Sequence, residues 1–357
     1  MLKRTRAALT EMKAALRMKD ALMMKDALMM RAALTKVTTF VLVAFIASLA
    51  FVATGGAAQS SQSSQSSQSS WMILPTLPVK EKGFPARLAP VVEAEHSFAQ
   101  YSIDRGMKDA FLNFAAPDGV IFRRGPVNAI ESWSRRNPAP TGLLTWWPVY
   151  ADVSRAGDLG WTTGPYEFRE KPTDEKPAGS GHYFTIWRRR PDGTWKFVVD
   201  LGIEHPAPNA PETALRYPAW LSKEKGTSGA AADADAARRS LLDAERSLAV
   251  DSASKGMTTA LLARADETLR LYRQDSFPVV GREAVRKTLK VMTEFVKWET
   301  LKTDVAASGD LGYAYGTYAL TPKGSDKPSE QGDYARVWRR ERGGPWRVVF
   351  NVTSAVR

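Results

Sequence analysis

The sequence predicts an α+β fold that is present twice along the chain, behind a leader segment. The first observation is a repeat: AEHSFA at 94–99 recurs as AERSLA at 244–249. Near the other end of each copy, YFTIWRRRPDGTWKFVVD (183–200) recurs as YARVWRRERGGPWRVVFN (334–351). The second observation is that helical spacing of apolar residues precedes strand-like runs in both copies. A length of 357 residues accommodates two such domains.

The elements of the first copy begin with two helices between Pro90 and about Ala116, interrupted at Gly106. A short strand over 120–122 and a third helix over 127–136 follow. The rest is predicted as strands rich in β-branched and aromatic residues, at 143–154, 159–169, 182–190 and 195–203. The second copy repeats this order, with 282–292 as its third helix. Each domain is therefore expected to place three N-terminal helices on a mostly antiparallel sheet.

A third repeated block lies between the helices and the last strands. Trp146-x5-Asp152-Val153-x3-GDLG recurs 152 residues later, with Asp304 in place of Asp152. The Gly-Asp pairs at 157–158 and 309–310 are interpreted as hairpin turns. The paired tryptophans near each C-terminal hairpin are interpreted as core packing; they are Trp187, Trp195, Trp338 and Trp346.

The N-terminal residues have the pattern of a secretory signal. Residues 1–36 form a basic region that holds half of the chain's net charge of +12, and 37–58 supply an apolar run and a small-residue cleavage site ending at Ala58. The alternative is a membrane anchor over 37–53. Either way, we expect the rest of the chain to be exported, periplasmic or secreted. Because KDALMM occurs twice within 19–30, we also expect translation to begin at Met29 or Met30.

Two linkers separate the folded parts of the chain. Residues 59–87 contain an S-S-Q tract followed by prolines, and 206–235 combine prolines with Gly, Ser and Ala. The domains are therefore expected at 88–205 and 236–357.

Composition excludes several classes of chemistry. The chain has no Cys and three His, so disulfides, thiolate metal sites and cysteine nucleophiles are excluded, and neither a metal nor a cofactor is expected. The sequence has no Gly-rich phosphate loop, no G-x-S-x-G and no H-E-x-x-H. Because half of the charge belongs to the leader, no nucleic-acid partner is expected, and the Arg188-Arg189-Arg190 triplet is interpreted as a solvated face.

The repeated blocks described above, in which helices lead into a run of strands, resemble the nuclear transport factor 2-like superfamily. The resemblance is strongest to its SnoaL-like, ketosteroid-isomerase-like and uncharacterised bacterial branch. The resemblance covers about 88–205 and 236–355. It implies cone-shaped domains, each with a pocket for a small, largely apolar molecule. It also implies pairing through the sheet faces, as a pseudo-dimer within one chain or as a homodimer. Superfamily members include isomerases, dehydratases, hydrolases and non-catalytic modules, so fold alone does not give function.

The catalytic candidates are His182 and Asp200. Counting back from a Pro-Asp-Gly turn that pairs Arg190 with Thr194 places them on one face, about a residue pair apart. A His and a carboxylate beside an apolar pocket could act as general base and orienting group. A solvated His and a carboxylate at the end of the sheet are the alternative.

Six further residues are candidates for lining a pocket. Asp200 with Tyr150 or Tyr166 would supply the base and donor that the isomerase analogy asks for. Asp152 and its counterpart Asp304 are candidates for pocket carboxylates, with a satisfied hydrogen-bonding role as the alternative. In the second copy, Asp333 and Asn351 occupy the positions of His182 and Asp200. The function is thus expected to be small-molecule binding, or alternatively an isomerase, dehydratase or hydrolase that uses the carboxylate and His pair.

Overall fold

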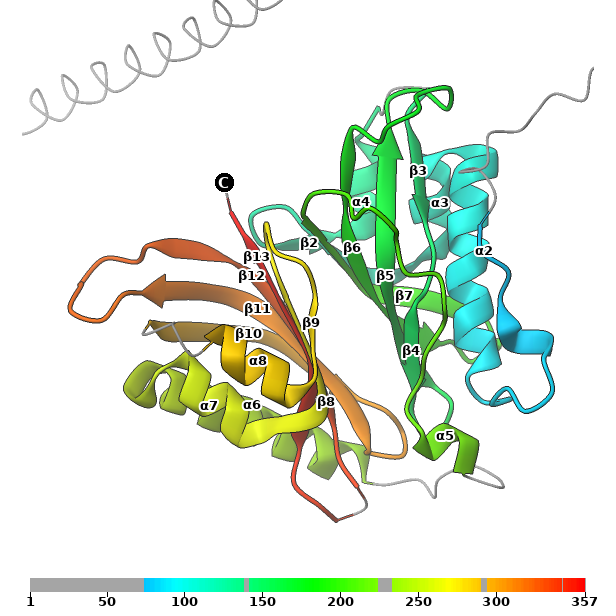
Figure 1. Ribbon diagram of the computed structural model, residues 1–357. Helices are drawn as coiled ribbons and strands as arrows, with labels where there is room; N and C mark the ends of the chain where they lie inside the picture. The colour runs from blue at the N-terminus through cyan, green and yellow to red at the C-terminus, as the bar shows by residue number, and fades with distance from the viewer. Residues whose placement is uncertain (1–73, 138–140, 224–232, 290–293, 342, 357) are drawn as a thin grey trace, which may run out of the picture. The chain divides into compact units, whose positions relative to one another are not determined.

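The computed structural model describes residues 74–137, 141–223, 233–289, 294–341 and 343–356 (Figure 1). The basic region, the signal or anchor segment with Ala58, the proposed start at Met29 or Met30 and the S-S-Q tract lie outside the described residues. Among the helices of the described part, none combines the length and apolar character that a membrane crossing requires.

The first domain places three helices on one face of a mixed sheet, in agreement with the predicted α+β class (Figure 1). Gly106 separates the first two helices at a φ of 88°, as expected of a residue without a Cβ. The sheet order is β2-β1-β7-β6-β5-β3, with β4 also paired to β5, and β1 runs parallel to β7. The elements are α2 (Ala89–Arg105), α3 (Met107–Phe114), β1 (Ala115–Phe122), β2 (Pro126–Asn128), α4 (Ala129–Ser134), β3 (Leu143–Trp146), β4 (Tyr150–Val153), β5 (Leu159–Arg169), β6 (Gly179–Arg189) and β7 (Trp195–Glu204).

The second domain repeats this order along the chain. Its sheet order is β10-β11-β12-β13-β8-β9, with β8 parallel to β13. Where the first domain has two short strands on either side of Pro148, the second has one continuous strand, because proline cannot donate to the ladder. The elements are α6 (Ala234–Lys255), α7 (Met257–Arg264), β8 (Ala265–Arg273), β9 (Val279–Val280), α8 (Arg282–Leu289), β10 (Phe295–Val305), β11 (Leu311–Thr321), β12 (Glu330–Arg339) and β13 (Arg347–Ala355).

A β-bulge interrupts the last hairpin of each domain. The loop forms as predicted, with Gly193 at a φ of 86° and the Arg190 amide donating to the Thr194 carbonyl at 2.7 Å. Beyond the loop, however, Ile186 pairs with Val199 while Trp187 pairs with Phe197, so Val198 is an extra residue. The second domain has the same bulge at Val349.

Each sheet has one face against its own helices and one face against the other domain. The helix faces form separate apolar clusters, centred on residues such as Phe98 in the first domain and Leu241 in the second. The opposite faces share one cluster that contains residues of both domains. At its centre, the rings of Phe184 and Phe350 stack with centroids 4.1 Å apart. Burial of this shared cluster is therefore a source of stability common to both domains.

Part of the linker packs along the first domain. A short helix, α5 (Trp220–Lys223), lies within it. The amide of Arg216 donates to the Val149 carbonyl at 2.9 Å, and the Ala151 amide donates to the Arg216 carbonyl at 3.1 Å. The linker thus adds a backbone bridge beside β4.

Candidate functional site

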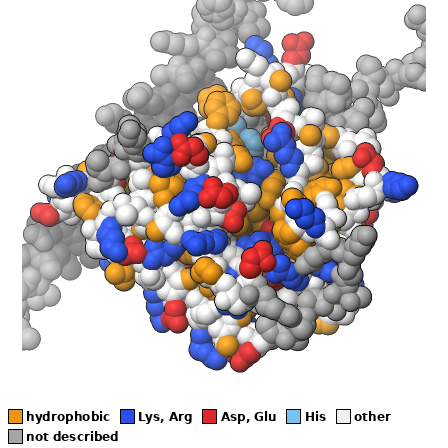
Figure 2. Space-filling view, turned by 60° about the horizontal axis from the view of Figure 1, so that its bottom comes forward, with side chains coloured by type: hydrophobic (Ala, Val, Ile, Leu, Met, Phe, Trp, Pro, Cys, Tyr) orange, Lys and Arg blue, Asp and Glu red, His pale blue; other side chains and the backbone are white. Residues whose placement is uncertain are grey.

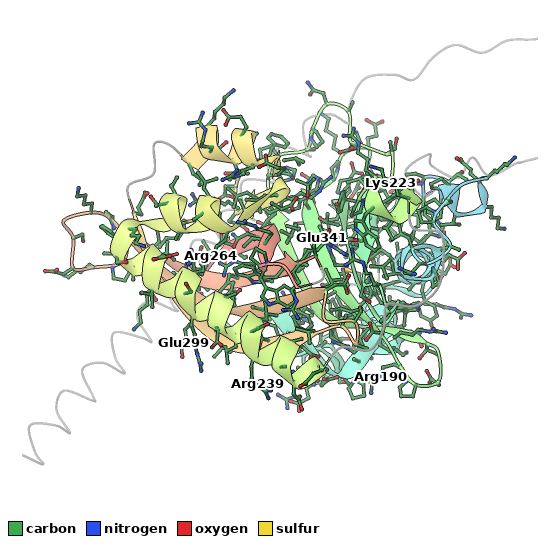
Figure 3. All side chains as sticks on the ribbon, turned by 90° about the horizontal axis from the view of Figure 1, so that it is seen from below. Arg190, Lys223, Arg239, Arg264, Glu299 and Glu341 are labelled. Atoms are coloured by element: carbon green, nitrogen blue, oxygen red, sulfur yellow. The ribbon has the colours of Figure 1, made fainter. Side chains whose placement is uncertain are left out.

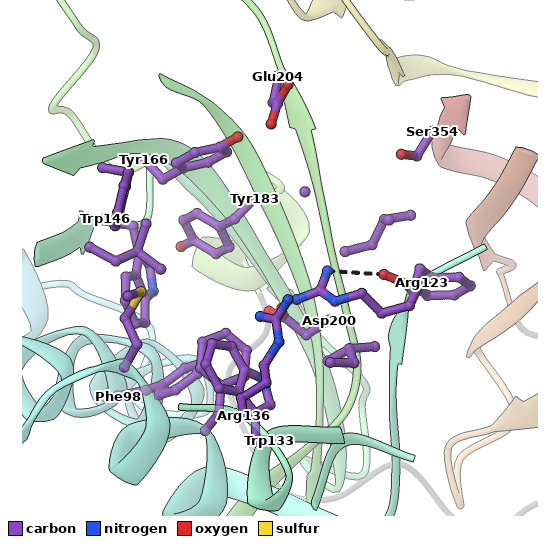
Figure 4. Close-up of a pocket in the computed structure, with 18 of the residues that line it drawn as sticks. Phe98, Arg123, Trp133, Arg136, Trp146, Tyr166, Tyr183, Asp200, Glu204 and Ser354 are labelled. Carbon is purple, nitrogen blue, oxygen red and sulfur yellow. Dashed lines mark hydrogen bonds between the residues drawn. The ribbon is translucent and has the colours of Figure 1, made fainter. Parts of the chain in front are cut away.

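The first domain encloses a cavity of about 590 Å³ between its helices and the concave side of its sheet (Figure 4). The volume lies within the range of small-molecule sites. Gln274, Ser354 and Ala355 of the second domain also line it. Much of the wall is aromatic, supplied by Phe98, Phe111, Trp133, Trp146, Tyr166 and Tyr183.

Asp200 faces this cavity because the bulge at Val198 shifts the register of β7. It pairs with Thr185, whose hydroxyl donates to Asp200 Oδ2 at 2.9 Å. Burial raises the pKa of Asp200 to about 7, and the neighbouring carboxylate of Glu95 adds to the rise. A carboxyl group with this pKa exchanges a proton near neutral pH, as a general base or acid requires.

Glu95, on α2, lies near Asp200 in the core of the first domain. Its side chain is fully buried on α2 and accepts hydrogen bonds from Trp146 Nε1 at 2.6 Å and Trp187 Nε1 at 2.8 Å, and from the Thr162 hydroxyl. Burial raises its pKa. Sequence reasoning missed this residue, although a charged residue inside the repeated AEHSFA block, among apolar helix positions, was a usable signal.

Two tyrosines add hydroxyl groups to the cavity wall. Tyr183 is 7% exposed, and its hydroxyl has no hydrogen-bond partner among the described residues. Burial, followed by the charge of Glu95, raises its pKa well above the ordinary value, so it is a neutral donor at physiological pH. Tyr166 was predicted as a candidate and does line the cavity, with its pKa also raised by burial.

His182 is not part of this site, which corrects the predicted pairing with Asp200. It pairs with Ile203 and faces the second domain, so the two side chains point to opposite faces of the sheet. The cause is the extra residue at Val198, since a shift of one residue moves every later side chain to the other face. His182 Nδ1 instead lies 2.7 Å from His205 Nε2.

The predicted carboxylates of the third block lie between the two sheets. Asp152 accepts from Arg339 Nη2 at 2.7 Å and Nε at 2.9 Å. The reciprocal pair joins Asp304 to Arg188 Nη2 at 2.8 Å. Both aspartates therefore hold the domains together, which was the stated alternative to a pocket role. Tyr150 is also in this interface, where the guanidinium carbon of Arg270 lies 3.9 Å from its ring centroid.

The interpretation of the arginine triplet as solvated is wrong for its first member. Arg188 is 20% exposed and forms the ion pair just described, as does its counterpart Arg339 at 11%. The adjoining turns are joined in the same way, since Arg155 Nη2 lies 2.9 Å from the carboxylate of Glu341, a residue that Figure 3 labels. On the face shown in Figure 2, positive, negative and hydrophobic side chains are interspersed.

The equivalent space in the second domain, lined by Met257, Trp298 and Tyr318, has no room for a water molecule, and Arg336 is buried against Trp298 beside it. This side chain is fully buried and lies between Glu245, with Nη1 to Oε2 at 2.8 Å, and Asn351, with Nε to Oδ1 at 2.8 Å. It occupies the position of Thr185 in the first domain, as the aligned sequences YFT and YAR show. Asn351 is thus a core residue of the second domain rather than part of an open pocket.

Asp333, the counterpart of His182, lies at the edge of the domain interface. Its Oδ2 accepts from the Gly125 amide of the first domain at 3.0 Å, and burial raises its pKa. It lines a separate, more polar hollow together with Arg124 and Glu299. Within the described ranges, no group of three or more His, Asp or Glu converges as metal ligands would.

Comparison with known proteins gives structural likeness only. No family model and no curated protein matches the sequence. A ketosteroid isomerase-like protein from Erwinia carotovora atroseptica is 16% identical, with a TM-score of 0.29, over 34% of this chain and 96% of its own. An NTF2-like protein with a cystatin-like fold from Novosphingobium aromaticivorans is 16% identical, with a TM-score of 0.28, over 34% and 82%. Their descriptions name the superfamily that the sequence resembles, and nothing about activity follows.

Proposed function

We propose that this protein binds one small, largely apolar molecule per chain, in the cavity of the first domain. The observation that carries the proposal is the contrast between the two domains. The positions that line a cavity of about 590 Å³ in the first domain leave no room for a water molecule in the second, where the Trp298 ring packs against the buried Arg336 side chain. Tyr183 also lines the cavity of the first domain, and its buried hydroxyl has no hydrogen-bond partner among the described residues.

The second domain has a supporting role in this proposal. It contributes Gln274 and Ser354 to the cavity wall, and its sheet covers the outer face of the first sheet. The ligand site would therefore depend on both domains although it lies within one.

The substitution Thr185→Arg tests the proposal by placing the arginine of the second domain, Arg336, at the equivalent position of the first. The new guanidinium would meet Glu95 and Asp200, the counterparts of Glu245 and Asn351. We expect binding of an uncharged fluorescent probe, N-phenyl-1-naphthylamine, to be lost while the fold is retained. Thr194→Arg makes the same change on an exposed hairpin and should leave binding intact. Equal probe affinity in both variants would contradict the proposal.

A second candidate function is acid–base catalysis on the bound molecule, of the isomerase, dehydratase or hydrolase type. Asp200 supports it, because its carboxyl has a pKa of about 7 and shares a cavity with the Tyr183 hydroxyl. In this version Asp200 removes or returns the proton and Tyr183 stabilises developing negative charge on oxygen. No histidine takes part. Asp200→Asn should abolish turnover of a carbon-acid substrate while preserving probe binding; unchanged turnover would reject this role.

We also propose that the protein is exported, on the basis of the basic and apolar N-terminal segments. Fractionation of cells that express the full chain, with N-terminal sequencing of the exported form, tests this. A mature N-terminus at Gln59 would support cleavage after Ala58, and protein confined to the cytoplasm would contradict export.

A further inference from the structure

We infer that the molecule bound in the first-domain cavity is an organic acid, whose anionic group is held by Arg123 and Arg136 while its apolar body lies among the aromatic side chains. This inference rests on the proposed binding function and specifies the chemical class of its ligand. Both arginines line the cavity (Figure 4), Arg123 from the residue after β1 and Arg136 from beyond the end of α4.

The Arg136 guanidinium is close enough to Arg123 to disfavour the charge of Arg123. The pKa of Arg123 is lowered first by burial and then by the charge of Arg136. Asp200 has the opposite effect on Arg123, but it is the smaller of the two charge effects. An anion placed between the arginines would relieve this repulsion.

Within the described part of the chain, neither side chain has a carboxylate within 4 Å. The Arg123 guanidinium donates through Nη1 to the neighbouring Phe122 carbonyl at 3.1 Å. The Arg136 guanidinium carbon lies 4.8 Å from the ring centroid of Trp133. By contrast, Arg188 and Arg339, at the domain interface, reach carboxylates at 2.8 and 2.7 Å. The cavity arginines thus retain donors for a ligand.

The chemistry of these donors favours a carboxylate. Guanidinium groups present paired N–H donors that match the two oxygens of a carboxylate, and such charge-assisted bonds are stronger than neutral ones. Trp133 lies beside Arg136 and stacks on Phe111 with centroids 4.4 Å apart, so an apolar wall adjoins the cationic end. Glu204 lines the cavity near Tyr166, away from the arginines (Figure 4). One end of the site is therefore cationic and the body is aromatic, as an aromatic or alicyclic carboxylic acid requires.

Two probes with the same ring skeleton separate charge from apolar fit. N-phenyl-1-naphthylamine is uncharged, and 1-anilinonaphthalene-8-sulfonate adds one sulfonate, which stands in for the carboxylate. Titration of the full chain by fluorescence gives a dissociation constant for each probe. In the double variant Arg123→Gln with Arg136→Gln, we expect the affinity for the sulfonate probe to fall by about tenfold or more. The affinity for the neutral probe should change less than twofold.

Arg135→Gln is the matched control. Arg135 adjoins Arg136 but follows the last residue of α4 and pairs with Glu131 at 3.5 Å, with 81% of its side chain accessible. Its replacement should leave both affinities unchanged. Raising the salt concentration should lower the affinity of the wild type for the sulfonate probe but not for the neutral probe. The same change should be smaller in the double variant.

The outcomes distinguish this inference from the function on which it rests. If Thr185→Arg abolishes binding of both probes, but the arginine substitutions leave their affinity ratio unchanged, the anionic class is overturned and the binding function stands. If Thr185→Arg leaves both probes bound, the binding function itself fails. The inference is supported if the double variant loses affinity for the sulfonate probe but not for the neutral probe, while Arg135→Gln keeps both affinities.

Discussion

Replacing Arg336 by methionine should strongly destabilise the second domain. Methionine keeps much of the apolar stem but removes the guanidinium, which is fully buried against Glu245 and Asn351. The substitution leaves the Glu245 carboxylate in the core without its cation. Trp338 Nε1 would still donate to it, but a hydrogen bond does not neutralise the charge.

The magnitude follows from the burial of both partners. Removing one member of a buried ion pair costs about 3–5 kcal/mol, because the remaining charge is uncompensated. With roughly 2–4 °C per kcal/mol for a protein of this size, the midpoint of thermal unfolding should fall by about 6–20 °C. The double substitution Arg336→Met with Glu245→Gln should cost less than Arg336→Met alone, since it removes the stranded charge.

Urea unfolding followed by tryptophan fluorescence measures these differences at neutral pH. Arg246→Met is the control, because Arg246 follows Glu245 on the same helix but its side chain is 68% exposed. That variant should change the free energy of unfolding by less than about 0.5 kcal/mol. A loss below about 1 kcal/mol for Arg336→Met, or a double variant less stable than the single one, would refute the reasoning.

Three further predictions concern the charged groups described above. Burial raises the pKa of folded Asp200 to about 7, so the free energy of unfolding of the wild type should fall by about 2–4 kcal/mol relative to Asp200→Asn as pH rises from 4 to 7. Burial, then His205 and Arg270, lower the pKa of folded His182 to about 3, so acidification from pH 7 to 5 should cost the wild type about 2 kcal/mol relative to His182→Gln. Urea unfolding across this pH range checks both. Arg339→Met should destabilise more than Arg188→Met in thermal unfolding, because Arg339 binds the fully buried Asp152 through two nitrogens; the reverse order would contradict this account.

Much of the fold was predictable because its signals are local. The strand over 159–169 and the helix break at Gly106 agree with the sequence interpretation. Both depend on neighbouring residues alone, through apolar periodicity and through a glycine that adopts a positive φ.

The candidate site was predicted only in part, because its composition depends on one extra residue. The turn chemistry fixes the register near Gly193, but the bulge at Val198 changes it five residues later. The sequence carries a trace of the bulge in the apolar run Phe197-Val198-Val199, which breaks strict alternation, and the second domain has a similar run at 348–350. Asp200 was therefore identified as a candidate residue but given the wrong neighbour, His182.

The difference between the two domains was visible in the sequence but could not be interpreted from it. Thr185 aligns with Arg336, yet an arginine at a strand position is usually solvent-exposed. Only the packing shows that its guanidinium lies between Glu245 and Asn351 in the core.

The shared apolar cluster between the sheets also determines how the protein responds to dilution. In a dimer of separate subunits, such a contact is lost when the concentration falls below the dissociation constant. Here Phe184 and Phe350 belong to the same chain, so their encounter is intramolecular and its probability is set by the length of the linker. The contribution of Ser354 to the cavity wall should therefore not depend on the protein concentration.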